Sequence, residues 1–267
     1  MTIGWQSGCV TTTTPALRVA LVQEASGLDP RANRARLAEL VPDDADLVVL
    51  PEAFARDFGE AGSDVSEYAE SLGGDFDDAV ARVAAERGTT VVAGMFETAP
   101  DPGRPFNTLV VRGAATADYR KVHLYDSFGY RESDRLTAGP IDPLVVDLGG
   151  WRVGLMTCYD LRFPEFARAL VDRGAEVLVV PAAWVAGPRK LDHWQTLVRA
   201  RAIENTVFIA AAAQPGPRYT GHSLVVDPLG DVLAEAAEEP GLVTATLERK
   251  VLDEARRTNP SLANRRL

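Results

Sequence analysis

The chain has 267 residues, of which 46% are hydrophobic, and a formal net charge of −10 at pH 7. Its length fits one large α/β domain, and its negative charge disfavours nucleic acid or an anionic membrane surface as the main partner. No apolar run is as long as a membrane span, no signal peptide is recognisable, and two cysteines form no disulfide framework, so we expect a cytoplasmic protein.

Residues 1–15 lack helical and strand periodicity and are predicted to be a flexible leader, in which Cys9 has no role. The domain is then expected to span residues 16–267. The three histidines show no metal-ligand spacing and no C-x-x-C motif is present, so we expect neither a metal nor another cofactor.

The first half of the chain alternates apolar runs with segments of helical periodicity. We predict a strand at 17–22, a helix at 29–40, a strand at 46–50, a helix at 76–84 and strands at 90–96, 107–111 and 116–121. Gly- and Pro-rich turns join the last three strands, which suggests antiparallel neighbours.

The second half repeats this order of elements. We predict a strand at 153–156, a helix at 164–171, a strand at 177–181, a helix at 191–204 and strands at 207–213, 223–226 and 232–234. Strands such as 177–181 have no polar alternation, so both of their faces are expected to be covered. The pattern predicts an α/β fold with helix, sheet, sheet, helix layering. The basic segment from Leu247 onward is expected to pack on the protein itself or on a second subunit.

Three predicted strands end on residues that suit acyl transfer from an amide. Cys158 lies in a strand-to-helix turn, where open α/β sheets often place their chemistry. A free thiol is mostly protonated at neutral pH, so it needs a base, and Glu52 at another strand end can serve as that base. Lys121 and the backbone N–H of Tyr159 can stabilise the negative charge of a tetrahedral intermediate. A buried cysteine without catalytic function is the competing interpretation.

The segments around these residues resemble those of a known family. Pro51–Phe54, Tyr119–Asp126 and Cys158–Glu165 look like the three catalytic segments of the nitrilase superfamily of carbon-nitrogen hydrolases, in that family's order. The similarity extends through Pro181–Trp184 and Arg199–Asn205, and it covers nearly everything after residue 15.

This resemblance implies that Glu52, Lys121 and Cys158 form the family's catalytic triad, on an αββα sandwich assembled as a homodimer or higher homo-oligomer. The family's second glutamate would fall on Glu132, although a surface acid is the ordinary expectation for that polar loop. Trp184 is expected either to wall the pocket or to be a packing aromatic.

The residues after Cys158 are similar to those of the omega-amidase and deaminated-glutathione amidase branch, which implies hydrolysis of an α-keto acid omega-amide through a thioester, with release of ammonia. In two alternatives the protein is still an enzyme but cleaves another bond, that of an N-carbamoyl amino acid or that of a nitrile. A third is a catalytically silent binding protein on the same fold. Arg162 and Glu165 are candidates for a substrate carboxylate contact or for an ion pair within the turn.

Overall fold

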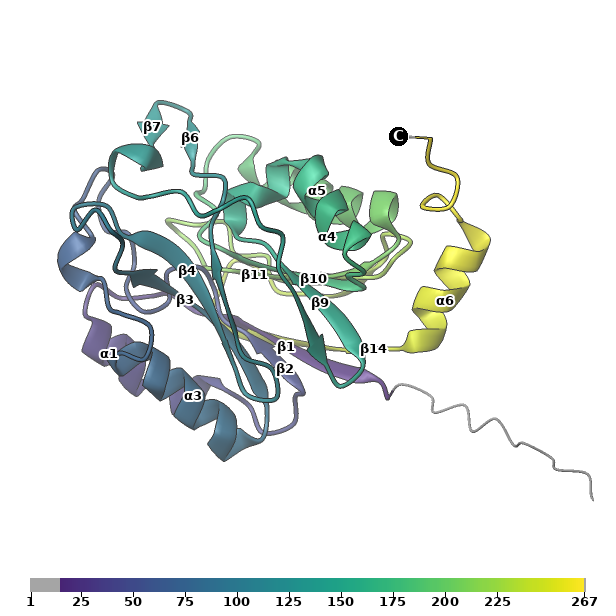
Figure 1. Cartoon of the computed structure of the whole chain (residues 1–267), viewed down its shortest axis with the longest axis horizontal. Coiled ribbons are helices and arrows are strands. Elements are labelled where there is room, and N and C mark those ends of the chain that lie inside the picture. The colour runs from purple at the N-terminus through teal and green to yellow at the C-terminus, as the bar shows by residue number, and fades with distance from the viewer. Residues whose placement is uncertain (1–14, 267) are drawn as a thin grey trace, which may run out of the picture.

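Two six-stranded mixed sheets pack face to face, and helices cover their outer faces (Figure 1). The computed structural model describes residues 15–266. The predicted αββα sandwich of the α/β class is confirmed. The expectations for the leader before Pro15, and for Cys9 in it, lie outside the described residues. None of the helices within this range has the length and apolarity needed to cross a membrane.

The first sheet has the strand order β14-β1-β2-β3-β4-β5. Its strands are β1 (Leu17–Gln23), β2 (Leu47–Val49), β3 (Thr90–Glu97), β4 (Phe106–Arg112), β5 (Ala117–Arg120) and β14 (Gly241–Leu247). β1, β2 and β3 are parallel, whereas β4, β5 and β14 pair antiparallel with their neighbours.

The second sheet has the order β13-β12-β11-β10-β9-β8. Its strands are β8 (Val145–Leu148), β9 (Trp151–Leu155), β10 (Val177–Ala182), β11 (Phe208–Ala213), β12 (Leu224–Val226) and β13 (Val232–Glu235). Again three consecutive strands, β9 to β11, are parallel and the outer strands are antiparallel. The predicted correspondence between the two halves of the chain is therefore confirmed.

Helices connect the parallel strands and pack on the outer faces of the sheets (Figure 1). They are α1 (Pro30–Ala35), α2 (Leu37–Leu40), α3 (Asp75–Arg87), α4 (Pro164–Asp172) and α5 (Lys190–Asn205). The last helix, α6 (Arg249–Thr258), follows β14 and lies to one side of the sandwich. The single helix predicted at 29–40 is divided at Arg36, which separates α1 from α2. Asp29 caps α1 by accepting a hydrogen bond from the Arg31 N–H, and Gly88 ends α3 in the left-handed conformation.

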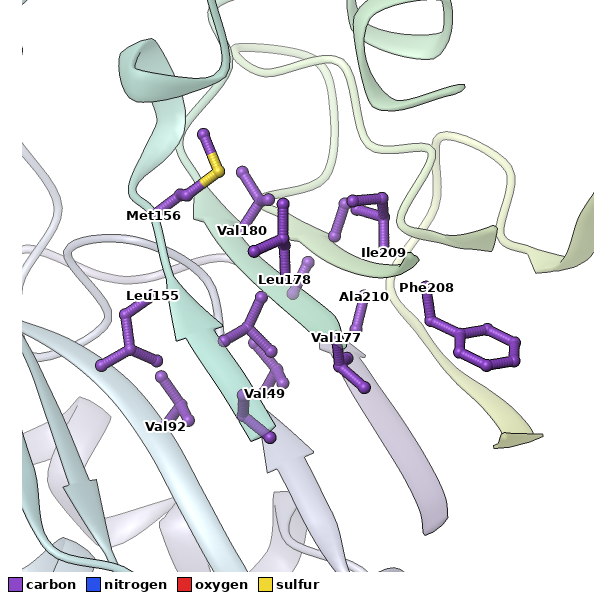
Figure 2. Packing of buried hydrophobic residues seen from close by; sticks show 14 of the residues in the cluster. Val49, Val92, Leu155, Met156, Val177, Leu178, Val180, Phe208, Ile209 and Ala210 are labelled. Carbon is purple, nitrogen blue, oxygen red and sulfur yellow. The ribbon is translucent and has the colours of Figure 1, made fainter. Parts of the chain in front are cut away.

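In the first sheet, alternating side chains of the central strands belong to two apolar layers, one on each face. In β1, Leu21 belongs to the layer between the sheets, and Val22 belongs to the layer under the helices α1 to α3. Figure 2 shows Val49 and Val92 of the first sheet beside Leu155 of the second. Because the central strands are buried on both faces, their sequences contain almost no polar residues.

Five strands and helices were not predicted: β8, β14, α6 and the two strands of a hairpin, β6 (Asp126–Ser127) and β7 (Tyr130–Arg131). β14 pairs with β1 along its whole length, and α6 follows it directly. The Arg249 guanidinium stacks over the Trp151 ring at 4.0 Å and forms an ion pair with Glu176. The basic C-terminal segment therefore packs on the protein itself, which is one of the two expected arrangements.

Candidate active site

Glu52, Lys121 and Cys158 line one cavity at an end of the sandwich where strands of both sheets terminate. Glu52 follows β2 by three residues, and Lys121 comes directly after β5. Cys158 opens a 3₁₀ turn, Cys158–Arg162, that follows β9. Three positions far apart in the sequence are thus brought to a common space by the two sheets.

The Glu52 carboxylate is held by hydrogen bonds from three elements. Its Oε1 accepts from the Lys121 ammonium at 2.9 Å and from the Asn107 amide at 2.7 Å. Its Oε2 accepts from the Ala183 backbone N–H, just after β10, at 2.7 Å. The side chain is 1% exposed, so these contacts replace the water that an ionised carboxylate would otherwise need.

Lys121 lies between two carboxylates. Its Nζ donates to Glu132 Oε2 at 2.9 Å as well as to Glu52. Burial alone would lower the pKa of Lys121, but the charges of Glu132 and Glu52 raise it well above the usual range. Burial raises the pKa of Glu132, which Lys121 opposes. The lysine is therefore a fixed cation at neutral pH. Glu132 is buried, which is contrary to the ordinary expectation of a surface acid.

Cys158 combines a strained backbone with a protonated thiol. Its φ of 45° is in the left-handed region, which costs a non-glycine residue about 1–3 kcal/mol. Burial, and after it the charge of Glu52, raises the pKa of the Cys158 thiol well above its ordinary value. At neutral pH the resting group is a thiol, so a base has to remove its proton during the reaction.

Asp160 links the cysteine turn to the segment that carries Lys121. Its Oδ2 accepts from the Thr157 N–H at 2.8 Å and from the Tyr119 hydroxyl at 2.6 Å. Its Oδ1 accepts from the His123 N–H at 3.0 Å and lies 2.7 Å from His123 Nδ1. Tyr119 and His123 stand two residues on either side of Lys121. These contacts give Asp160 and His123 structural roles in holding the two segments together.

The cavity has a volume of about 510 Å³, which is large enough for a small organic substrate. Trp184 contributes to its wall, which is one of the two positions expected for it, and Tyr159 also lines the cavity. Trp184 also packs against Trp194 with 5.4 Å between ring centroids, so the two expectations for this residue hold together. Arg218 reaches the wall while paired with buried Asp57 at 2.9 Å.

The ion pair considered for Arg162 and Glu165 is not formed. Glu165 is exposed at the start of α4, whereas Arg162 points its guanidinium over the Trp184 ring at 4.9 Å and lines the cavity. The separation arises because Pro164 begins a new helix directly after the 3₁₀ turn. Only the first of the two candidates therefore belongs to the site.

Several residues of this site were not predicted from the sequence, among them Asn107, Tyr125 and Lys190. Asn107 is a fully buried amide near the start of β4, and a buried amide of this kind needs a hydrogen-bond partner. Lys190 is one of only three lysines in the chain. Tyr125 could not be recognised from the sequence as a site residue, because other aromatic residues occur on both sides of it in the chain.

The arrangement provides a nucleophile, a base beside it and a cation near both. A carbonyl carbon bound next to Cys158 would find an acceptor for the thiol proton in Glu52. Negative charge that develops on its oxygen would be stabilised by Lys121 in a cavity largely shielded from water. These are the requirements of acyl transfer through a thiol.

Comparisons with known proteins agree with this geometry. The Carbon-nitrogen hydrolase family model matches residues 18–257. A deaminated glutathione amidase from Escherichia coli is 41% identical over 233 residues, which cover 86% of this chain and 88% of that protein.

Solved structures that resemble this chain also come from carbon-nitrogen hydrolases and amidases. A CN-hydrolase superfamily protein from Xanthomonas campestris, solved with an arsenic adduct in its active site, has a TM-score of 0.85 and 32% identity, covering 95% of this chain and 98% of that one. A glutamate-to-glutamine variant of an amidase from Nesterenkonia, with acrylamide added to its active-site cysteine, has a TM-score of 0.74 and 30% identity, covering 92% and 99%. The chain belongs to the carbon-nitrogen hydrolase family of the nitrilase superfamily and is an amidase-type enzyme that cleaves amide carbon-nitrogen bonds.

Proposed function

We propose that this enzyme hydrolyses the terminal amide of a small α-keto acid through a thioester on Cys158, and that Glu52 and Lys121 complete the catalytic triad. The observation that carries the proposal is the Lys121 ammonium, held 2.9 Å from both Glu52 and Glu132 in the cavity that Cys158 lines. An ion-paired cluster of this kind is costly to bury and needs a compensating function.

In the first half-reaction the Cys158 sulfur attacks the amide carbon while Glu52 accepts the thiol proton. The carbonyl oxygen becomes an oxyanion, which Lys121 and the Tyr159 N–H stabilise. Glu52 then passes the proton to the nitrogen, the carbon-nitrogen bond breaks and ammonia leaves, so that a thioester remains.

In the second half-reaction water replaces the amine. Glu52 takes a proton from the water, whose oxygen attacks the thioester carbon. The carbon-sulfur bond breaks, the sulfur recovers the proton from Glu52, and the carboxylic acid departs and loses its own proton to the solvent. Glu132 holds Lys121 in place throughout, because it contacts the ammonium with both oxygens, at 3.1 and 2.9 Å.

The relatives support the choice of substrate. The Escherichia coli relative is named for its action on deaminated glutathione, and the Nesterenkonia relative is an amidase with a reactive cysteine. A small α-keto acid amide also suits a cavity of about 510 Å³.

The test is a panel of α-ketoglutaramate, deaminated glutathione, glutamine, asparagine, an N-carbamoyl amino acid and a nitrile, with ammonia as the readout. We expect the two keto acid amides to give the largest kcat/KM. Intact-protein mass spectrometry of the wild type, quenched during turnover, should detect an acyl adduct that is absent from Cys158→Ala. Turnover by a folded Cys158→Ala variant, or activity on the N-carbamoyl compound or the nitrile alone, would overturn the proposal.

A further inference from the structure

Two cations of the cavity wall have no carboxylate partner among residues 15–266. Arg162 contacts the His193 Nδ1 atom at 3.4 Å and the Trp184 ring, and its buried Nε has no hydrogen-bond partner. The Lys190 Nζ donates to the Tyr125 hydroxyl at 2.8 Å. The other cations of the wall, Lys121 and Arg218, are each paired with acids.

Lys190 is unusual because a lysine is rarely buried without a counter-charge. The residue is 8% exposed, and its ammonium lies 3.9 Å from the centroid of the Phe128 ring and 5.0 Å from that of Tyr125. Burial, and then the nearby charge of Arg162, lowers the pKa of Lys190. Two like charges in one cavity destabilise each other, and an anion bound between them would relieve this cost.

The backbone holds Lys190 in this position. Its carbonyl oxygen accepts from the Trp184 indole N–H at 2.9 Å. The preceding residue, Arg189, has a φ of 61°, a strained conformation that begins α5 at Lys190. These backbone contacts therefore fix the position of Lys190 in the cavity wall.

One tyrosine connects Lys190 to the proposed catalytic cluster. The Tyr125 backbone N–H donates to Glu132 Oε2 at 2.5 Å, while its hydroxyl accepts from Lys190. Arg162 likewise ends the 3₁₀ turn that begins with Cys158. Lys190 and Arg162 therefore line the same cavity as Cys158.

We propose that Lys190 is a specificity-determining residue whose ammonium, together with the Arg162 guanidinium, binds a carboxylate at the far end of the substrate. The proposal rests on the proposed amide hydrolysis and adds the residue that selects for anionic amides. Lys190 and Arg162 would together form charge-assisted hydrogen bonds to the carboxylate.

The experiment compares two amides of equal chain length: glutaramate, which carries a terminal carboxylate, and pentanamide, which carries a methyl group there. We expect Lys190→Met to lower the ratio of kcat/KM for glutaramate to that for pentanamide by roughly 10- to 100-fold, mainly through KM, since one hydrogen bond between charged groups is lost. Lys190→Arg keeps the charge and should restore part of the ratio. Lys250→Met, whose side chain is 80% exposed, is the matched control and should leave the ratio unchanged.

A binding arm separates this inference from the proposed function. Glutaramate and pentanamide are titrated calorimetrically into Cys158→Ala with Lys190 present or replaced by Met. Stronger binding of glutaramate that depends on Lys190 would support the subsite even if the wild type hydrolysed neither amide. An unchanged ratio in Lys190→Met, with equal losses for both amides, would overturn the inference and would mark Lys190 as a support for the Phe128 loop.

Discussion

The two halves of the chain build sheets of the same design but carry different residues at their strand ends. In each half, three parallel strands are followed by two antiparallel ones. Glu52 follows β2, and the equivalent β10 is followed by Ala183, whose N–H binds the Glu52 carboxylate. Cys158 follows β9, whereas Glu24 follows β1.

This difference shows that the topology places the strand ends, whereas the residues at those ends supply the chemical groups. The repeated topology brings the ends of both sets of strands to one cavity, and it does so regardless of side chain. The first half then supplies the acid and the ammonium, and the second half supplies the thiol and an N–H donor. The proposed chemistry needs both halves, so substitutions that disturb the contacts between them should lower the activity.

The largest expected effect comes from removing the charge that the first half presents to the thiol. Glu52→Gln should lower kcat/KM by about 10³-fold, because it removes the general base. Ammonia release measures the loss. Glu39→Gln, at an exposed position on α2, is the control and should retain wild-type activity. Retention of more than a tenth of the activity in Glu52→Gln would contradict the assigned role.

The same variant should make the thiol more reactive toward alkylation. The charge of Glu52 helps to raise the pKa of Cys158, so its removal lowers that pKa and increases the thiolate fraction at a given pH. The rate of iodoacetamide modification, followed from pH 6 to 10, should rise in the wild type only above the ordinary thiol pKa of about 8.5. In Glu52→Gln the rise should shift to lower pH, and a shift to higher pH would refute the explanation.

Asp160→Asn should weaken the connection between the halves. Asparagine keeps one acceptor oxygen, so its NH₂ group would face either the Thr157 N–H, which donates to Oδ2, or the His123 N–H, which donates to Oδ1. That N–H would remain unsatisfied in the interior. We expect a loss of about 3 kcal/mol in the free energy of unfolding and about 10²-fold in kcat. Urea denaturation measures the free energy of unfolding, and ammonia release measures kcat. Asp147→Asn, at an exposed site, should change neither, and an equal response of both variants would exclude a specific linking role.

The smallest effect is expected where the first half holds Glu52 through its backbone. A Cβ on Gly94 of β3 would lie 2.5 Å from the Ala53 nitrogen and 3.1 Å from the Glu52 Cα, so Gly94→Ala has to displace this segment. We expect a loss of about 2 kcal/mol in unfolding free energy and about 10-fold in kcat. Gly241→Ala, with no atom within 4 Å of its Cβ, is the matched control. Equal kcat values for the two variants would show that the close approach does not position Glu52.

Much of the fold was predictable because the central strands are continuous apolar runs, as in β10, and because α4, which lies between two of them, has a strong apolar period. The edge strands were harder to predict. β14 has mostly exposed residues and is a strand because β1 offers it a partner. The break at Arg36 likewise depends on how α1 and α2 pack, which local propensity does not specify.

The α/β pattern, its repetition and the strand ends that carry Glu52, Lys121 and Cys158 follow from apolar periodicity and motif spacing, which are local properties of the chain. Three features depend on the folded arrangement: the burial of Glu132 against Lys121, the raised pKa of the Cys158 thiol and the position of Lys190 in the cavity wall. Burial and electrostatic pairing depend on residues that are distant in the chain, and these residues come into contact only when the two sheets pack together.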